Sequence, residues 1–530
     1  MNWEKISNTI GILLVLICFV FALGRIISLR MRESADNPNQ QQTLRIAHFQ
    51  LEAGVREAID EIAKRYMEKH PNVRVVQIPI PERIFKNWRI TQLVGGTPPD
   101  LIVSGQGLTD ENLARYYLPL GELANRPNPY NKGTPFENTP LRETYFDGME
   151  GGFNSVLMDF YSVPATTGTF RMFYNLDLVK EITGDTKIPQ SYQEFIELCE
   201  KTQEFAKRTG RKIAPVGGSK FNANILMDFM FASQTQRMLQ EKINRPGQLS
   251  ILASPTMVAR AYLRDEWSLD SPEVHSGLEL IRNLVAQLPP GFSQMERDDG
   301  TFHFAQGGAV MVPTGSWDAT SLRIFSPFPL GVGKLPVPDQ TDPEYGKFAY
   351  GVISEAGATS GFNLGIAKGG KVELAEDFLQ FMSSQAMNKV WTDVSLWPPA
   401  VLGVEPAEEA RPFMPTPGGY PPGFGISVMG ADSTRLYQNN LFRLTGADGS
   451  VDSFLEELKP AYISALVSDM KRSERENRNN TRRADSAAAA VAIQALHDPA
   501  RNQKLDLLIQ SRVTSEKTVH QISNTLLYQP

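Results

Sequence analysis

The sequence predicts an α/β protein of at least two lobes, with a helical extension at its carboxyl end. Residues 44–103 alternate short apolar runs with amphipathic segments of helical spacing. This alternation is typical of a mostly parallel sheet with helices on its faces. A chain of 530 residues is longer than one core usually organises, which favours two lobes. From residue 451 onward the composition changes to charged and alanine-rich stretches of helical character.

Composition and charge exclude several classes of function. Charged residues make up 21% of the chain and the net charge is −6, so no nucleic-acid partner is expected. The sequence contains no phosphate-binding glycine loop, no metal-ligand spacing and no hydrolase nucleophile motif, so we expect no cofactor, no metal and no enzyme. Cys199, the one cysteine outside the amino-terminal apolar segment, is expected to be a small buried side chain.

Residues 1–33 predict a membrane anchor or a signal segment. The apolar core, residues 10–23, is short for a membrane span, and Ala-Leu-Gly at 22–24 suits signal cleavage. Snorkelling of Arg25 would lengthen the span, so we favour an uncleaved anchor and keep a cleaved signal peptide as the alternative. Taken alone, the arginines after the segment would place the folded part in the cytoplasm. Residues 34–43 are polar and typical of a linker.

Polar side chains follow two of the first strands, at the point where each strand ends. The expected strands are 44–49, 73–80 and 100–103, and the expected helices are 55–66 and 84–94. Gln50 and Glu52 come after the first strand, and Ser104 and Gln106 after the third. Ligands of α/β proteins bind outside the carboxyl ends of the strands. We therefore predict that these four side chains share one rim.

Residues 161–177 (YSVPATTGTFRMFYNLD) are typical of a crossing between two lobes. A short extended run ends in a break around Gly168 that is rich in hydroxyls, and a strongly β-prone segment follows. A Pro/Gly break between two strands, deep inside a long α/β chain, suits a passage from one lobe to the other. The hydroxyls of Thr167 and Thr169 are then expected at the floor of the shared cleft.

The remaining elements continue the alternation and end in helices. The expected helices are 192–209, 225–238, 274–288, 372–382 and 387–393, and the expected strands are 213–217, 309–312, 331–338 and 362–367. In the extension, residues 454–470 form an amphipathic helix that we expect to be interrupted near Pro460. A charged stretch at 471–483 precedes an alanine-rich helix at 484–495, whose composition suits close helix packing.

Two tryptophans in turns are candidates for contact with a sugar. Trp317 stands in a Gly-Ser-Trp-Asp turn after a strand, and Trp397 precedes a Pro-Pro break. An indole offers a flat apolar face to a sugar ring, while groups such as Asp318 bond its hydroxyls. We favour a site over a core position for Trp317 and leave the two open for Trp397. Glu52 with Asp318 would suit glycosidic hydrolysis, a less favoured alternative.

Taken in order, these segments resemble the carbohydrate-type extracellular solute-binding proteins of ABC importers, the group that includes maltose-binding protein. The segments that carry the resemblance are 96–102 (GTPPDLI), 161–164 (YSVP), 173–178 (FYNLDL), 189–195 (PQSYQEF), 304–311 (FAQGGAVM) leading to 315–317 (GSW), and 375–382 (AEDFLQFM) with 398–400 (PPA). Each is weak alone, and their shared order over residues 44–401 makes the resemblance specific. Leu176 stands where the family usually has Lys.

The resemblance implies a periplasmic-binding-protein type II fold, with two lobes that close on a ligand by hinge motion. We expect lobe 1 to comprise residues 44–163 and 306–365, lobe 2 to comprise 164–305 and 366–450, and the helical extension to comprise 451–530. The implied cleft residues are those named above together with two at the start of a late strand. In full they are Gln50, Glu52, Ser104, Gln106, Thr167, Thr169, Trp317, Asp318, Phe362, Asn363 and Trp397.

The resemblance also implies a function and a location. The chain is expected to bind a carbohydrate outside the cytoplasm, held at the membrane by its amino-terminal segment, and to deliver the sugar to ABC permease subunits. This location takes precedence over the orientation that the arginines suggest. A membrane-tethered sugar sensor that signals through the tail, and a glycoside-active enzyme, are the alternatives. For the extension we favour capping of one lobe over docking of a partner.

Overall fold

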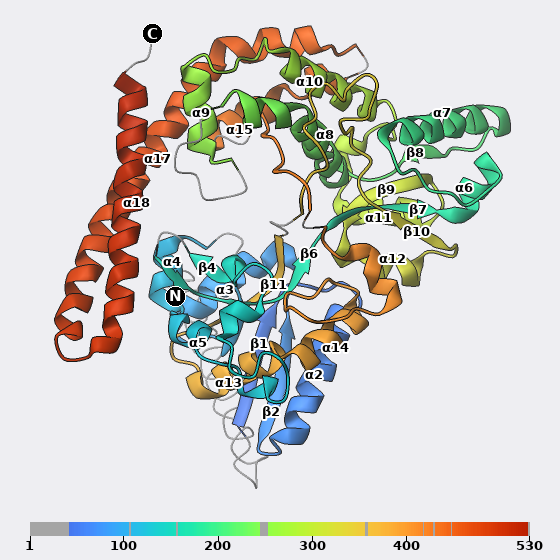
Figure 1. Cartoon of the computed structure of the whole chain (residues 1–530). Helices are drawn as coiled ribbons and strands as arrows, with labels where there is room; N and C mark the ends of the chain where they lie inside the picture. Colours follow the sequence, from blue (N-terminus) through green and yellow to red (C-terminus); the bar gives the residue numbers. More distant parts are fainter. Residues whose placement is uncertain are drawn as a thin grey trace, which may run out of the picture.

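Two separate sheets divide the chain into two lobes (Figure 1). The computed structural model describes residues 42–104, 108–154, 157–243, 253–355, 359–416, 418–427, 430–446 and 448–527. The predicted anchor and most of the linker lie outside these residues. Among the described residues, no helix is long and apolar enough to cross a membrane.

The first-lobe sheet has the strand order β2-β1-β3-β11-β6. Its strands are β1 (Gln42–His48), β2 (Val73–Pro79), β3 (Leu101–Val103), β6 (Val163–Gly168) and β11 (Thr359–Ile366). β1 runs parallel to β2 and β3, while β11 runs antiparallel to β3 and β6. The carboxyl ends of β1 and β3 therefore lie at the same edge, as the alternation of strands and helices predicts.

Helices that pack on this sheet complete the first core. They are α2 (Val55–Lys69), α3 (Glu82–Val94), α4 (Asp110–Tyr116), α5 (Gly121–Asn125), α13 (Val372–Met382) and α14 (Gln385–Ser395). The buried residues of α2 recur at intervals of three and four from Val55 to Tyr66, which places them on one helical face. α14 packs against α2, although more than 300 residues of chain separate them.

The second-lobe sheet has the strand order β10-β7-β9-β8. Its strands are β7 (Phe170–Asn175), β8 (Ala214–Val216), β9 (Ala309–Gly315) and β10 (Leu330–Gly333). Its helices are α6 (Leu176–Thr183), α7 (Tyr192–Thr209), α8 (Lys220–Glu241), α9 (Pro255–Leu263), α10 (Pro272–Val285), α11 (Arg297–Ala305), α12 (Ala319–Phe325), α15 (Ala431–Asn440) and α16 (Phe442–Thr445). A two-stranded pair, β4 (Phe153–Asn154) and β5 (Asp159–Phe160), lies apart from both sheets.

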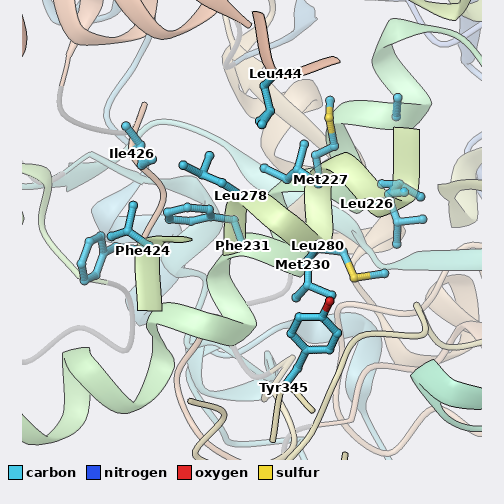
Figure 2. Close-up of a cluster of buried hydrophobic side chains, with 14 of the residues drawn as sticks. Leu226, Met227, Met230, Phe231, Leu278, Leu280, Tyr345, Phe424, Ile426 and Leu444 are labelled. Atoms are coloured by element: carbon cyan, nitrogen blue, oxygen red, sulfur yellow. The ribbon is translucent and has the colours of Figure 1, made fainter. Parts of the chain in front are cut away.

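The second-lobe core forms where α8 and α10 pack together (Figure 2). Phe231 of α8 lies beside Leu278 of α10, and Phe424 from a later loop belongs to the same buried cluster (Figure 2). A Cβ atom at Gly277 would lie 2.6 Å from the ring of Phe231, so the close approach of the two helices requires glycine there.

The sheets correct the expected division of the chain. β9 and β10, expected in lobe 1 as part of 306–365, pair with β7 in the second sheet. α13 and α14, expected in lobe 2 as part of 366–450, bury their apolar faces in the first core. Hydrophobic periodicity identifies a strand or a helix, but the partner of each strand depends on contacts that are remote in sequence.

The described chain crosses between the lobes at three places, which are named in chain order the first, second and third crossings. β6 continues into β7, the segment after β10 returns to β11, and the segment after α14 leads to the short helix η6 (Glu408–Phe413) in the second lobe. Arg171 of β7 is 1% exposed. It pairs with Glu355 of the second crossing at 2.5 Å and donates to the carbonyls of Pro412 and Met414 at the end of the third crossing. Arg171 therefore holds the second and third crossings together beside the second sheet.

The carboxyl extension is a pair of antiparallel helices, α17 (Val451–Ala495) and α18 (Asn502–Leu527), drawn in orange to red in Figure 1. The expected interruption near Pro460 is wrong, because α17 continues through that residue. Leu458 and Tyr462, on either side of the proline, are fully buried. Burial of this face offsets the missing proline hydrogen bond, so packing decides the path of the helix.

Candidate functional site

A cluster of three charged side chains joins the two lobes. Arg297 stands at the first position of α11 in the second lobe, and its Nη2 lies 2.6 Å from Oδ1 of Asp318. The same Nη2 lies 3.5 Å from Oε1 of Glu52, which follows β1 in the first lobe. Asp318 ends the turn after β9 and also accepts a hydrogen bond from Thr314. Each carboxylate therefore follows a central strand of its own sheet, and one guanidinium lies between them.

The cluster is partly removed from water, which sets its electrostatics. Burial raises the pKa of Glu52 above its ordinary value, in spite of the opposing attraction of Arg297. Burial lowers the pKa of Arg297, but the attraction of Asp318 and Glu52 outweighs it, so the net direction is upward. With all three groups ionised, the cluster carries one net negative charge.

Aromatic rings line one side of this cluster. The guanidinium carbon of Arg297 lies 5.4 Å from the ring centroid of Phe221 and 6.0 Å from that of Trp317. Trp317 meets Phe170 edge to face at 5.4 Å, and it also packs against the first-lobe core. A Cβ atom at Gly315 would lie 2.3 Å from the indole, so glycine is needed for this position of the ring. An indole from the second lobe is thus held at the junction of the lobes.

Several buried polar atoms at the junction have no hydrogen-bond partner among the described residues. In the charged cluster and its neighbours they are Oε1 of Gln50, Oε2 of Glu52, Nε of Arg297 and Nε1 of Trp317. Leaving such a group unpaired costs about 1–3 kcal/mol, and a ligand that pairs with it recovers part of that cost. Two acceptors and two donors beside an aromatic ring can bind a polyhydroxylated molecule.

The amino-acid sequence of the chain matches a known family. A family model described as "Bacterial extracellular solute-binding protein" matches residues 61–414, more than half of the chain. The chain belongs to this family. A comparison with curated protein sequences returned no match.

Solved structures share the two-lobed fold of the family. RafE in complex with raffinose is 16% identical, with 80% of this chain and 99% of that chain covered and a TM-score of 0.52. A chitin oligosaccharide binding protein is 15% identical over 81% and 100% of the two chains, with a TM-score of 0.52. A cyclic alpha-maltosyl-1,6-maltose binding protein from Arthrobacter globiformis is 14% identical over 80% and 99%, with a TM-score of 0.51. The predicted family and the predicted α/β fold of two lobes are confirmed.

The rim expected in this solute-binding fold is present at the carboxyl ends of β1 and β3. Gln50 is 4% exposed and Glu52 belongs to the charged cluster. Ser104 donates its backbone N–H to the carbonyl of Asn363 at 3.0 Å, and the Asn363 amide donates to Gly151 at 2.9 Å. Gln106 lies outside the described residues. Of the four rim residues expected from the sequence, the structure places Gln50 and Glu52 next to the junction.

The hydroxyls of the first crossing are bonded to the third crossing. Thr167 donates to the carbonyl of Pro399 at 3.4 Å, and Thr169 donates to that of Phe413 at 2.6 Å. Both residues are buried. The expectation that these hydroxyls face a ligand differs from the structure, because backbone carbonyls remote in sequence already use them.

Two aromatic residues expected in the cleft belong to the first-lobe core. Phe362 is fully buried and packs against Trp391 at a centroid distance of 4.9 Å. Trp397 is 2% exposed and lies over Gly361, whose Cβ would come within 2.9 Å of the indole. Of the alternatives open for Trp397, the structure favours the core.

Sequence reasoning missed Arg297, Phe170 and Phe221. Arg297 lies in the polar run 296–299 (ERDD), which is typical of a solvated loop. Its partner Glu52 is remote in sequence, so no local pattern could have singled it out. Phe221, which is 39% exposed, lies in the first turn of α8 and carries no sequence signal that separates it from other aromatic residues.

Proposed function

We propose that this solute-binding protein takes up a sugar or an oligosaccharide between its lobes and passes it to the permease subunits of an ABC importer. The observation that carries the proposal is the cluster of Glu52, Arg297, Asp318 and Trp317, to which both lobes contribute. Carboxylates and a guanidinium suit the hydroxyls of a sugar, and the indole suits its apolar face. Two structural neighbours, RafE in complex with raffinose and a chitin oligosaccharide binding protein, bind carbohydrates, which supports the same class of ligand.

Closure of the lobes gives the proposal its mechanism. Glu52 belongs to one lobe and the other three residues to the other lobe, so rotation about the crossings changes their separation. A ligand that bonds to Glu52 and also stacks on Trp317 contacts both lobes. Such a ligand favours the closed arrangement by its differential affinity for it. The closed form would then be the one presented to a permease.

The amino-terminal segment completes the proposal. We expect residues 1–33 to hold the protein at the outer face of the cytoplasmic membrane, with a cleaved signal peptide as the alternative. Amino-terminal sequencing of the protein from membrane and soluble fractions distinguishes the two. A mature chain that begins after residue 24 and is recovered in the soluble fraction would contradict the anchor.

A thermal-shift screen tests the ligand class. The full chain is incubated with a panel of mono- and oligosaccharides, and we expect at least one to raise the melting temperature. Ligand at a hundred times its Kd stabilises the folded state by about 2.7 kcal/mol. Trp317→Ala should then weaken binding at least about tenfold, which corresponds to roughly 1.4 kcal/mol.

Trp88→Ala is the matched control, because Trp88 lies on α3 and packs against the first-lobe core. We expect it to change stability but leave Kd unaltered. The proposal fails if no sugar shifts the melting temperature, or if a bound sugar keeps its Kd in both Trp317→Ala and Glu52→Ala.

A further inference from the structure

The carboxyl-terminal hairpin, defined as α17 with α18, is rooted in the second lobe. The first turns of α17 bury Phe454, Leu458 and Tyr462 in the second-lobe core. The hydroxyl of Tyr462 donates to the carbonyl of Ile426 at 3.1 Å. Further along, Asp469 accepts hydrogen bonds from the backbone N–H groups of Asp432 and Ser433 at the amino end of α15. The root of the hairpin thus moves with the second lobe.

Beyond residue 472, α17 extends away from that lobe and α18 returns alongside it. Glu474 accepts a hydrogen bond from Ser523 at 2.6 Å, and Asp485 pairs with Arg512. Ala484 and Ser511 are buried, and such small side chains permit close packing of the two helices. Paired along its length, the hairpin is stiffer than a single exposed helix.

The tip of the hairpin, defined as the turn between α17 and α18 with the first residues of α18, contacts the first lobe. Lys504, at the start of α18, pairs with Asp159 of β5, and Arg501 lies 3.5 Å from Glu122 of α5. The Asp159 side chain is 7% exposed, so its contact with Lys504 is largely shielded from water. Gly121 makes room for this carboxylate, because a Cβ there would lie 2.5 Å from its Oδ1. The first lobe therefore presents a nearly buried acid to a lysine of the tip.

The hairpin and the crossings lie on different sides of the molecule. In Figure 1 the hairpin runs down the left side, whereas β6 leads into β7 toward the right. The 26 residues from Met470 to Ala495 in α17 span about 39 Å at 1.5 Å per residue. When one lobe rotates about the crossings, points far from that axis move most. The contact of the tip with the first lobe is hence sensitive to the angle between the lobes.

We propose that the hairpin is a brace that holds the lobes at the angle seen here, and that a change of this angle requires the tip to leave Asp159 and Glu122. The crossings connect the lobes on one side and the brace connects them on the other. Opening and closing are then coupled to two ion pairs that salt and mutation can weaken. The inference assumes, from the proposed function, that the lobes move about the crossings, but its test needs no ligand.

Distance measurements between spin labels test the brace. In the full chain, with Cys18 replaced by Ser, one label pair at Glu68→Cys and Lys207→Cys reports the angle between the lobes. A second pair, at Leu496→Cys and Glu143→Cys, reports the contact of the tip with the first lobe. The remaining thiol, Cys199, is fully buried and burial raises its pKa, so it does not take up label.

Charge reversal at the tip is the perturbation, and we expect Lys504→Glu to change both distances. The tip pair should lose its single narrow distance, and the lobe pair should gain a second population. Asp159→Asn removes the same ion pair from the side of the first lobe and should act in the same direction. Lys517→Glu, the same reversal at an exposed site further along α18, is the matched control and should change neither distance.

Two results of these distance measurements would contradict the brace. If the tip is released while the distance between the lobes stays unchanged, the hairpin is not a brace. If the double reversal Lys504→Glu with Arg501→Glu leaves the tip in place, the ion pairs do not hold it and the proposal is wrong. Failure of every sugar to bind would overturn the proposed function without affecting these distances, so the two failures are distinguishable.

Discussion

Replacement of Arg297 by methionine tests the charged cluster directly. Methionine keeps much of the length and the apolar stem that packs beside Phe221 and Trp317, but it removes the charge. Asp318 and Glu52 then lose the guanidinium between them. Their side chains are 7% and 19% exposed, so water replaces that cation poorly.

The expected loss of stability follows from this burial. Removing one partner of a buried ion pair typically costs 3–5 kcal/mol, and the 26% exposure of the Arg297 side chain points to the lower end of that range. We expect the free energy of unfolding to fall by roughly 3 kcal/mol near pH 8. The matched control is Arg211→Met, whose pair with Glu181 is about half exposed on both sides and should contribute about 0–1 kcal/mol.

Urea unfolding, followed by tryptophan fluorescence and by circular dichroism, measures the loss. Coincident transitions in the two signals establish that a single free energy describes the unfolding. The loss should shrink as the pH falls, because protonation of Glu52, whose pKa is raised by burial, removes one of the unpaired charges. A loss no larger than that of Arg211→Met, or one that grows on acidification, would refute the reasoning.

Two further changes test other parts of the structure. Asp469→Ala leaves the backbone N–H groups of Asp432 and Ser433 without their acceptor, each now bonded at 2.9 Å, and should cost roughly 3 kcal/mol in urea unfolding. Asp469→Asn should recover part of it, and equal losses would contradict the assignment. Tyr462→Phe removes one buried hydrogen bond and should cost about 1 kcal/mol by the same assay, where a neutral result would contradict its role.

Local signals in the sequence predicted many element boundaries. Ser191 caps α7 by accepting from the N–H of Glu194, directly before the helix expected at 192–209. The rim at the ends of β1 and β3 was also predictable, because parallel strands place their carboxyl ends together. Glu52 and Trp317 followed from their positions directly after strands.

Packing decided what those signals left open. Thr169 carries the same hydroxyl whether it faces a ligand or the carbonyl of Phe413, and only the path of the third crossing settles which. Pro460 interrupts a helix by local rules, whereas burial of Leu458 and Tyr462 carries α17 through it. In both cases the deciding contact lies outside the local segment.

The sequence alone determined the kinds of elements, their order, the two-lobed α/β class and the helical character of the tail, because periodicity and capping act over a few residues. The tertiary structure decided that β9 joins the second sheet, that Arg297 lies between Glu52 and Asp318, and that Lys504 reaches Asp159. These contacts join residues far apart in the chain, so the energy of each depends on the whole fold. No local pattern records them.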